Sequence, residues 1–350
     1  MVPRHVEFDD DLINSLKRKI YYVRLGSIRA VRFNVNGTYC LTCGADKKLK
    51  LWNPQRQLLL KTYGGHANEV LDAAGSCDSS QIISCSSDKS VILWDVSTGQ
   101  TVRRYRGHSS SVTCIKFNEE STMAVSGSVD NTVLLWDIIS RRLEPVQTLK
   151  DAKDTITSIQ VTDHEIMTCS VDGHVRLYDI RMGRMTSDYI GSILTHGSIT
   201  HDGQCYVLSC ADNTVKLFDK DSGELLNTFK GHECRDYLLE NSINATDSRV
   251  ISGSATGEIL FWDLISSSCL FKLVHNKNKA VVSINHHPTE NMLLSACEDE
   301  VNVFCCLNPS FETILVHTNV LSVSHYKLRQ TQWGVSQTFY QERWRMIDGT

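Results

Sequence analysis

Two sets of histidine, serine and aspartate could support nucleophilic catalysis in this chain of 350 residues. They share one internal spacing and start 42 residues apart: His66, Ser84 and Asp88, then His108, Ser126 and Asp130. In a hydrolase triad the histidine takes the proton of an exposed nucleophile, and the enzyme needs one such arrangement. Here the arrangement is duplicated, and a tryptophan lies six residues after each aspartate. Duplication beside a large apolar side chain favours a structural role over a catalytic one.

We therefore expect each set to form a buried polar network. The aspartate would accept a hydrogen bond from the histidine ring, and the ring and the tryptophan indole would both donate to the hydroxyl. Leaving one buried member without its partner costs about 1–3 kcal/mol, so such a group tends to be complete or replaced as a whole. The predicted structural tetrads are His66, Ser84, Asp88 and Trp94, then His108, Ser126, Asp130 and Trp136.

The elements that hold these side chains belong to a repeated phrase, such as SSDKSVILWD ending at Asp95 and SVDNTVLLWD ending at Asp137. Its aromatic residue recurs every 40 to 44 residues, at Trp52, Trp94, Trp136, Tyr178, Phe218, Trp262 and Phe304. A Gly-His pair precedes three of the phrases, at residues 65–66, 107–108 and 231–232. This period and these pairs are the signature of the WD repeat, which supplies four strands to each propeller blade. The sequence predicts an all-β, seven-bladed WD-repeat β-propeller.

The other repeats depart from the tetrad. Arg24 and Ala152 replace the histidine, Leu208 and Leu294 replace the hydroxyl residue, and Thr256 replaces the aspartate. We expect these blades to depend more on apolar packing.

The ring has to close without leaving an open sheet edge. Each repeat starts with the outer strand of one blade and continues with three inner strands of the next, so the last blade lacks a strand. We expect residues 19–23 to close the ring by pairing with residues 300–305. The predicted organisation is an N-terminal segment (1–16), the propeller (17–306) and a divergent C-terminal tail (307–350). The tail is either an extension that is partly disordered or packed on the rim, or a segment that binds a partner.

Composition limits the possible partners. The formal net charge of -4 gives no general attraction for nucleic acid or anionic membranes. The N-terminal residues lack the apolar core of a signal peptide, and no stretch approaches the roughly 18 apolar residues of a membrane span. We expect a monomeric propeller in the cytoplasm and the nucleus that neither reads nucleic acid directly nor contacts membranes.

No feature of the sequence indicates a metal, a cofactor or a catalytic motif. The thirteen cysteines are expected to be reduced and mostly buried in strands. Cys40 and Cys43 form a C-x-x-C, but a zinc site needs a second pair of ligands at comparable spacing, and none appears. Phosphate-binding glycine loops, zinc-protease motifs and nucleophile elbows are absent from the sequence.

The predicted binding surface is the face where the innermost strands begin. It combines the residue before each turn aspartate with residues that flank the first strand of each blade, and most of them are small or apolar. The predicted protein-binding face is Ser27, Arg29, Ala45, Glu69, Leu71, Ser87, Thr113, Val129, Thr157, Val171, Leu194, Ala211, Tyr237, Leu238, Ala255 and Val282. Such a surface suits a peptide or protein segment, because aromatic and arginine anchors carry most interface energy. The alternative is that these residues only cap the ends of the blades.

Individual stretches resemble one family more closely than WD repeats in general. Examples are RAVRFNVNGTYCLTCGADKKLKLWNP from Arg29, SRRLEPVQTL from Ser140 and HHPTENMLL from His286. The chain resembles, over residues 17–304, the mitogen-activated protein kinase organizer family of WD-repeat scaffolds, and departs from it after Cys306. The resemblance implies a non-catalytic scaffold that holds MAP kinase (ERK) cascade components, contacts a prolyl hydroxylase and belongs to the spliceosome in pre-mRNA splicing.

Two other functions compete with a scaffold. The segment Tyr178-Asp179-Ile180-Arg181 resembles the W-D-x-R box through which some propellers dock to a cullin ubiquitin ligase as substrate receptors. A propeller enzyme would need ionisable groups that converge in the channel, and the loop residues of the predicted face do not supply them.

Overall fold

The computed structural model describes residues 27–235, 237–276, 279–297 and 301, together with the backbone of strands at 18–20, 300–306 and 315–316. The predicted segment 1–16 lies outside the described residues. So does the predicted tail, apart from the strand at 315–316, and its two interpretations remain open. In the described part no helix is long and apolar enough to cross a membrane.

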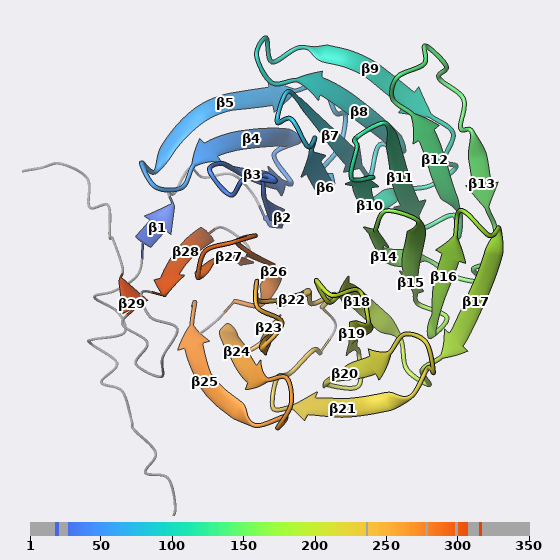
Figure 1. The fold of residues 1–350 in the computed structure, drawn as a ribbon. Coiled ribbons are helices and arrows are strands. Elements are labelled where there is room, and N and C mark those ends of the chain that lie inside the picture. The colour runs from blue at the N-terminus through green and yellow to red at the C-terminus, as the bar shows by residue number, and fades with distance from the viewer. Residues whose placement is uncertain are drawn as a thin grey trace, which may run out of the picture. The chain divides into compact units, whose positions relative to one another are not determined.

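Four-stranded antiparallel sheets dominate the described chain, and in each the strands follow one another in sequence from the centre outward (Figure 1). The first three sheets are β2 (Ile28–Phe33), β3 (Cys40–Gly44), β4 (Lys48–Asn53) and β5 (Leu58–Gly64); β6 (Val70–Gly75), β7 (Gln81–Ser86), β8 (Ser90–Asp95) and β9 (Thr101–Arg106); and β10 (Val112–Phe117), β11 (Met123–Ser128), β12 (Val133–Asp137) and β13 (Gln147–Leu149). The next three are β14 (Ile156–Val161), β15 (Glu165–Ser170), β16 (His174–Asp179) and β17 (Arg184–Tyr189); β18 (Leu194–Ile199), β19 (Cys205–Cys210), β20 (Thr214–Asp219) and β21 (Leu225–Lys230); and β22 (Asn241–Ile243), β23 (Arg249–Gly253), β24 (Glu258–Asp263) and β25 (Cys269–Val274). The prediction of an all-β propeller is confirmed.

One further sheet joins strands from both ends of the sequence. It holds β26 (Val281–His286), β27 (Met292–Cys297), β28 (Glu300–Cys306), β1 (Arg18–Ile20) and β29 (Leu315–Val316). β1 pairs with β28 in antiparallel register, with Arg18 opposite Val303 and Ile20 opposite Val301. Residues 21–23, which we also expected in this pairing, lie outside the described residues.

Burial explains why the inner strands read as nearly continuous apolar runs. Every residue of β3 is buried, whereas most residues of the outer strand β17 are exposed. An inner strand has a neighbouring sheet on both faces, so it lacks the polar alternation of a half-exposed strand. The outer strand of a blade has the solvent beside it, so more of its residues are exposed, including the apolar Leu58, Leu59 and Leu60 of β5.

The hydrophobic core is divided into clusters, each filling the space between two neighbouring sheets. One cluster joins Leu49 and Tyr63 of one sheet to Ile82 and Trp94 of the next. Another joins strands far apart in sequence, because Val31 and Trp52 pack with Leu294 and Ala296.

Aspartates stabilise two tight turns in the repeated phrase, one between the second and third strands and one before the outer strand. In the turn between the second and third strands, Asp88 Oδ1 accepts the N–H of Ser90, and the residue between them, Lys89, has a φ of 68°. In the turn to the outer strand, Asp95 Oδ1 accepts the N–H of Thr98. Aspartate suits both turns because its short side chain can bond to the backbone two or three residues on.

Candidate functional site

The two tetrads form closed hydrogen-bond networks. His66 Nδ1 lies 3.0 Å from Asp88 Oδ2, and His66 Nε2 lies 2.8 Å from Ser84 Oγ. The indole N–H of Trp94 donates to the same hydroxyl at 2.8 Å. The second set matches, with His108 bonded to Asp130 and Ser126, and Trp136 bonded to Ser126 at 2.8 Å.

One bond in our predicted network has the wrong direction. Burial lowers the pKa of His66, and this effect outweighs the opposing charge of Asp88, so the ring is neutral at pH 7. A neutral imidazole has one N–H, which it donates to Asp88, and Nε2 must then accept. The Ser84 hydroxyl therefore donates to the histidine and accepts from Trp94, which leaves it saturated, buried and unfit as a nucleophile.

Blades without the histidine contain an ion pair that our expectation did not include, although apolar packing also contributes, as at the fully buried Leu208. In three of them a cation four residues after the turn aspartate binds that aspartate: Lys50 to Asp46 at 2.6 Å, Arg176 to Asp172 at 2.7 Å, and Lys216 to Asp212 at 3.4 Å. The turn aspartate is thus bound either by a neutral histidine from the preceding loop or by a cation from the third strand of its own blade.

The substitution we assigned to Leu294 was also wrong. Ser295, one residue later, takes the hydroxyl position, because it pairs with Asn302 just as Ser84 pairs with Ile92. Its hydroxyl lies 2.8 Å from His275 Nδ1, so this blade also has a histidine-hydroxyl pair. His275 follows an apolar strand without the Gly-His signature, which is why the sequence pattern missed it.

Backbone hydrogen bonds bring together the two loop sets of the predicted face. The backbone N–H of the residue before a turn aspartate donates to the backbone carbonyl of the residue just before the innermost strand. The pairs are Ala45 to Ser27, Ser87 to Glu69, Val129 to Ser111 and Val171 to Thr155. A β-bulge then turns the next position outward, at Arg29, Leu71, Thr113, Thr157 and Val282.

The exposure of this face varies among its members. Arg29 is exposed and forms an ion pair with Glu69 of the neighbouring blade at 2.9 Å. Tyr237, Leu238 and Val129 are exposed, at 38%, 55% and 40%. Partly buried members are Ser27, Ala45, Glu69, Leu71, Ser87, Thr113, Thr157, Val171, Ala211 and Val282.

Two predicted members of the face are buried. Leu194 is 0% exposed because it occupies the core position before the bulge, opposite Cys210. Our register in this blade was wrong by one residue, and Ile193, which is 45% exposed and accepts the N–H of Ala211, lies on the face instead. Ala255 is only 8% exposed.

Ionisable side chains do converge in the channel, but from strand positions that our sequence reasoning did not consider. Arg32 Nη2 lies 2.7 Å from Glu240 Oε1, and its Nη1 donates to Glu240 Oε2 at 2.8 Å. Arg32 Nε lies 3.0 Å from Asp72 Oδ1, close enough for an ion pair although the N–H is not aligned for a hydrogen bond. Arg32 lies on β2, Asp72 on β6 and Glu240 just before β22, so the cluster draws on three different blades.

The pKa values identify this cluster as a fixed ion-pair network. Burial alone would raise the pKa of Glu240, but the charge and hydrogen bonds of Arg32 lower it to about 2. Burial alone would lower the pKa of Arg32, and the two carboxylates raise it instead. Both groups therefore stay charged and do not exchange protons near neutral pH, as a general acid or base must.

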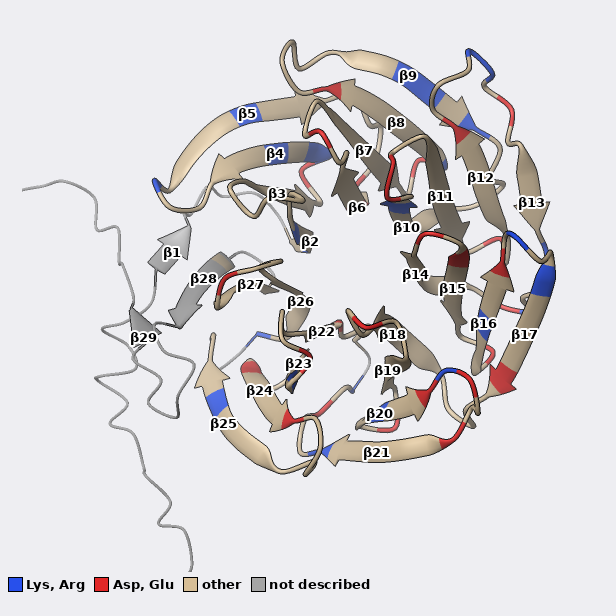
Figure 2. Cartoon of the chain, viewed as in Figure 1, with Lys and Arg blue, Asp and Glu red and all other residues tan. Residues whose placement is uncertain are grey.

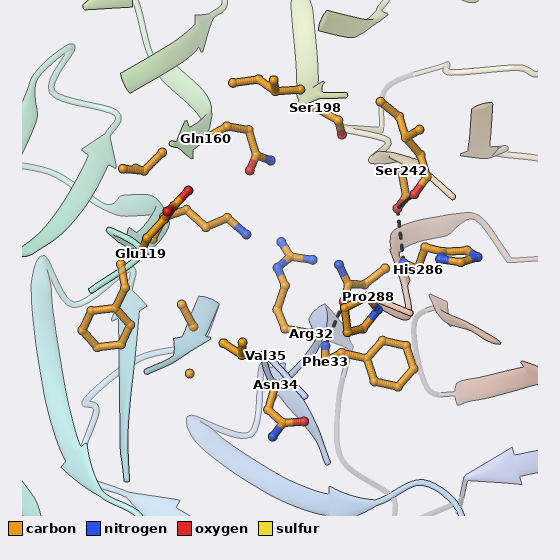
Figure 3. Close-up of a pocket in the computed structure, with 18 of the residues that line it drawn as sticks. Arg32, Phe33, Asn34, Val35, Glu119, Gln160, Ser198, Ser242, His286 and Pro288 are labelled. Carbon is orange, nitrogen blue, oxygen red and sulfur yellow. Dashed lines mark hydrogen bonds between the residues drawn. The ribbon is translucent and has the colours of Figure 1, made fainter. Parts of the chain in front are cut away.

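A pocket of about 530 Å³ opens at the end of this channel. Its lining includes Arg32, Asn34 and Val35 near the end of β2, and corresponding positions near the ends of other innermost strands. Figure 3 shows Arg32 projecting into the middle of the pocket, with Gln160, Ser198 and Ser242 around it. The pocket was missed because its residues are adjacent only after the sheets assemble.

The C-x-x-C pair is split between two parts of the core. Cys40 packs in the cluster with Trp52, whereas Cys43 packs in the cluster with Leu49 and Tyr63. Burial raises the pKa of both thiols, to about 12 for Cys40. Among the described residues, no group of three or more histidine, cysteine, aspartate or glutamate side chains could hold a metal ion.

Comparison with known proteins agrees with this architecture. The model of the WD domain, G-beta repeat, matches residues 19–53, 57–95, 99–137 and 143–179. WD repeat domain-containing protein 83 of Rattus norvegicus is 62% identical over 271 residues, which cover 77% of this chain and 86% of that protein. The chain belongs to the WD repeat domain-containing protein 83 family.

Other members of the family extend the similarity to distant organisms. The Homo sapiens protein is 59% identical, with the same coverage of 77% of this chain and 86% of its own length. The Dictyostelium discoideum homolog is 34% identical over 78% of this chain and 93% of its own length. A WD-repeat propeller in this family points to a non-enzymatic, protein-interaction role.

Proposed function

We propose that this protein is a scaffold that assembles multiprotein complexes through the face where its innermost strands begin. The observation that carries the proposal is the construction of that face. The paired loops of each blade present small and apolar groups around a few large anchors, chiefly Arg29, Tyr237 and Leu238. Aromatic and arginine side chains dominate binding energy at protein interfaces, and small neighbours allow a partner segment to approach closely.

The proposed partners follow from the resemblance to the organizer family of scaffolds. They are components of the MAP kinase (ERK) cascade, a prolyl hydroxylase and proteins of the spliceosome. Such partners require the protein in both the cytoplasm and the nucleus. The described surface supports protein recognition better than nucleic-acid recognition, because the strands around the centre contain few charged residues. Figure 2 shows few coloured segments on these strands, with blue segments for Lys and Arg on β2 and β10.

Proximity labelling of wild-type protein and Arg29→Glu tests this proposal. The variant places two carboxylates together at the Arg29–Glu69 pair and should reduce recovery of kinase-cascade and spliceosomal proteins. Arg184→Glu is the matched control, since Arg184 is an exposed arginine at the start of the outer strand β17. Equal recovery with both variants and the wild type would show that the face is wrongly assigned.

We further propose that the propeller, residues 17–306, has seven blades and that β1 closes the ring. The antiparallel pairing of Arg18 with Val303 supports this proposal, as does the cluster joining Val31 and Trp52 to Leu294 and Ala296. A chain that begins at residue 24 should melt at a markedly lower temperature than one that begins at residue 17. Equal melting temperatures of the two chains would refute closure by β1.

A second candidate function, substrate receptor of a cullin ubiquitin ligase, is favoured by one observation. The Arg181 side chain is 66% exposed and, within the described residues, pairs with the similarly accessible Asp163 at 3.2 Å. Asp179, in contrast, is explained by its turn, where it accepts the N–H groups of Arg181 and Met182. If the cullin adaptor co-purifies with the wild type and with Arg184→Ala but not with Arg181→Ala, this function is supported. If the adaptor does not co-purify with the wild type, this function is refuted.

A further inference from the structure

The turn between β2 and β3 touches the turn between β26 and β27, where the sheets from the two ends of the sequence meet. Gly37 lies in the first turn with a φ of 70°, and a Cβ built on it would lie 1.7 Å from His287 Nε2 in the second. A side chain at position 37 would therefore occupy the place of the imidazole ring. Residues of both turns line the channel pocket, so the contact forms part of its wall: Asn34, Val35, His286 and Pro288.

The His287 ring is held in its neutral form by the backbone around it. Its Nδ1 accepts the N–H groups of Thr289 at 3.2 Å and of Glu290 at 2.8 Å. A ring nitrogen that accepts carries no hydrogen, so the neutral ring bears its proton on Nε2, the atom that faces Gly37. The residue is buried and packs edge-on against Phe33, with 5.0 Å between the ring centroids.

Protonation of this ring would break the arrangement. An imidazolium has a hydrogen on both nitrogens, so Nδ1 would point a proton at two N–H groups instead of accepting them. Burial lowers the pKa of His287, and the Glu290 carboxylate and the Gly37 backbone, which favour the charged ring, do not offset this effect. The folded protein therefore gains stability from the neutral ring above pH 6.5, the ordinary pKa of histidine, and loses it as the pH falls below that value.

The ionisable groups around His287 leave it as the one that responds first to acid. The facing turn, residues 34–39, contains Tyr39 but no acidic or basic side chain. The neighbouring His286 is coupled to His287, but burial lowers the pKa of His286 to about 4, so it is still uncharged when His287 begins to take up a proton. Two groups from other sheets act on His286 rather than on His287, namely His201 and Arg249.

We propose that Gly37 and His287 form a pH-sensitive latch, which holds the β2–β3 turn on the β26–β27 turn at neutral pH and releases it on acidification. Deeper in the same junction the sheets are joined by uncharged groups, because Ser283 Oγ accepts the N–H of Val31 at 3.0 Å and Asn285 Oδ1 accepts that of Phe33 at 2.8 Å. Release of the latch therefore separates the two turns and opens one wall of the pocket, while the strands stay together. The latch is distinct from closure by β1, which lies at the other edge of the sheet that contains β26.

Hydrogen exchange of the full chain, resolved to single amides, tests the latch. The amides of Thr289 and Glu290 donate to His287 and should be protected at about pH 7.5. Their protection factors, corrected for the intrinsic effect of pH on exchange, should fall by up to about tenfold at about pH 5.5. The amide of Met123, which donates to the Asn118 side chain in the corresponding turn of another sheet, should keep its protection factor.

Two glycine variants separate the latch from backbone strain. Gly37→Ala should lower the protection of the two amides at both pH values, because the added Cβ displaces the ring. Gly203→Ala is the matched control. Gly203 has the same φ of 70° and the same place in its turn, but within the described residues no atom lies within 4 Å of its added Cβ. This variant carries the same strain and should leave both amides protected.

A histidine variant and a measurement on the wild type complete the test. His287→Asn keeps an oxygen that can accept N–H groups and removes the titration, so protection in this variant should not depend on pH. In nitrogen NMR of the histidine-labelled wild type, neutral His287 should carry its proton on Nε2 and titrate below pH 6.5.

Four results would each overturn the latch. They are equal protection of Thr289 and Glu290 at both pH values, a pH dependence in His287→Asn equal to that of the wild type, equal loss of protection in Gly37→Ala and Gly203→Ala, and a proton on Nδ1 of neutral His287.

Discussion

The Arg32 guanidinium and the Glu240 carboxylate meet in a two-point contact in the channel, although 208 residues separate them in the sequence. The carboxylate also accepts the Ser283 hydroxyl at 2.6 Å and the N–H of Ile284 at 3.1 Å. Three sheets are thereby linked around one buried charge pair.

Loss of one partner of this pair should destabilise the protein strongly. Arg32→Met leaves Glu240 and Asp72 buried without their counter-ion, and breaking a buried pair in this way costs about 3–5 kcal/mol. Arg235→Met removes an arginine from an exposed pair with Glu233 and should cost less than about 1 kcal/mol. Urea unfolding of both variants checks the difference, and equal costs would show that the channel pair is solvated.

His66 and His232, the histidines of two Gly-His pairs, should differ in how their substitution changes the stability of the protein. His66→Leu leaves Asp88 and Ser84 without their shared partner and should cost about 1–3 kcal/mol. Among the described residues neither ring nitrogen of His232 has a hydrogen-bond partner, so His232→Leu should leave stability unchanged or raise it. Thermal unfolding at neutral pH compares them, and a large loss in the His232 variant would indicate a partner for that ring.

Acidification should destabilise the wild type partly through the same histidine. Burial lowers the pKa of His232 from 6.5 to about 4. Between these values the unfolded chain binds a proton that the folded chain does not. The contribution of His232 to the free energy of unfolding is therefore fully present above pH 6.5 and is lost as the pH drops toward 4. His232→Leu should lose less stability than the wild type over this range in thermal melts. Parallel losses would mean that His232 titrates normally in the folded protein.

The corrected register on the binding face gives a paired test. Leu194 is fully buried, so Leu194→Ala should cost about 2–5 kcal/mol. Ile193 is 45% exposed, and Ile193→Ala should change stability by less than about 1 kcal/mol. Chemical denaturation of the two variants decides the register, and the reverse order of costs would restore the one we first predicted.

The sequence predicted the parts of the fold that depend on local spacing. The period of the aromatic residue placed Trp94 and Trp136 on the third strand of their blades, and fixed offsets identified the histidine, serine and aspartate that surround them. A blade is a local unit of consecutive strands, so its internal contacts repeat with the sequence.

Features that depend on neighbouring blades could not be predicted in the same way. The error at Leu194, in contrast, could have been avoided, because the offset of 17 residues from Arg29, Leu71 and Thr113 to their turn aspartates leads from Asp212 back to Thr195. The replacement of histidine by Lys50 or Arg176 involves a strand position that is Ile92 in a complete tetrad, so spacing alone did not reveal it. Contacts across the channel, such as Arg32 with Glu240, have no sequence signature at all.

Site-specific photo-crosslinking tests the central claim, that partners bind the face where the innermost strands begin. A benzophenone amino acid replaces Tyr237, an aromatic anchor of that face that is 38% exposed. The control replaces Tyr189, which is 68% exposed on the outer strand β17. In cell extracts, position 237 should yield discrete adducts with partner proteins and position 189 should yield none. Adducts at position 189 with none at position 237 would contradict the account.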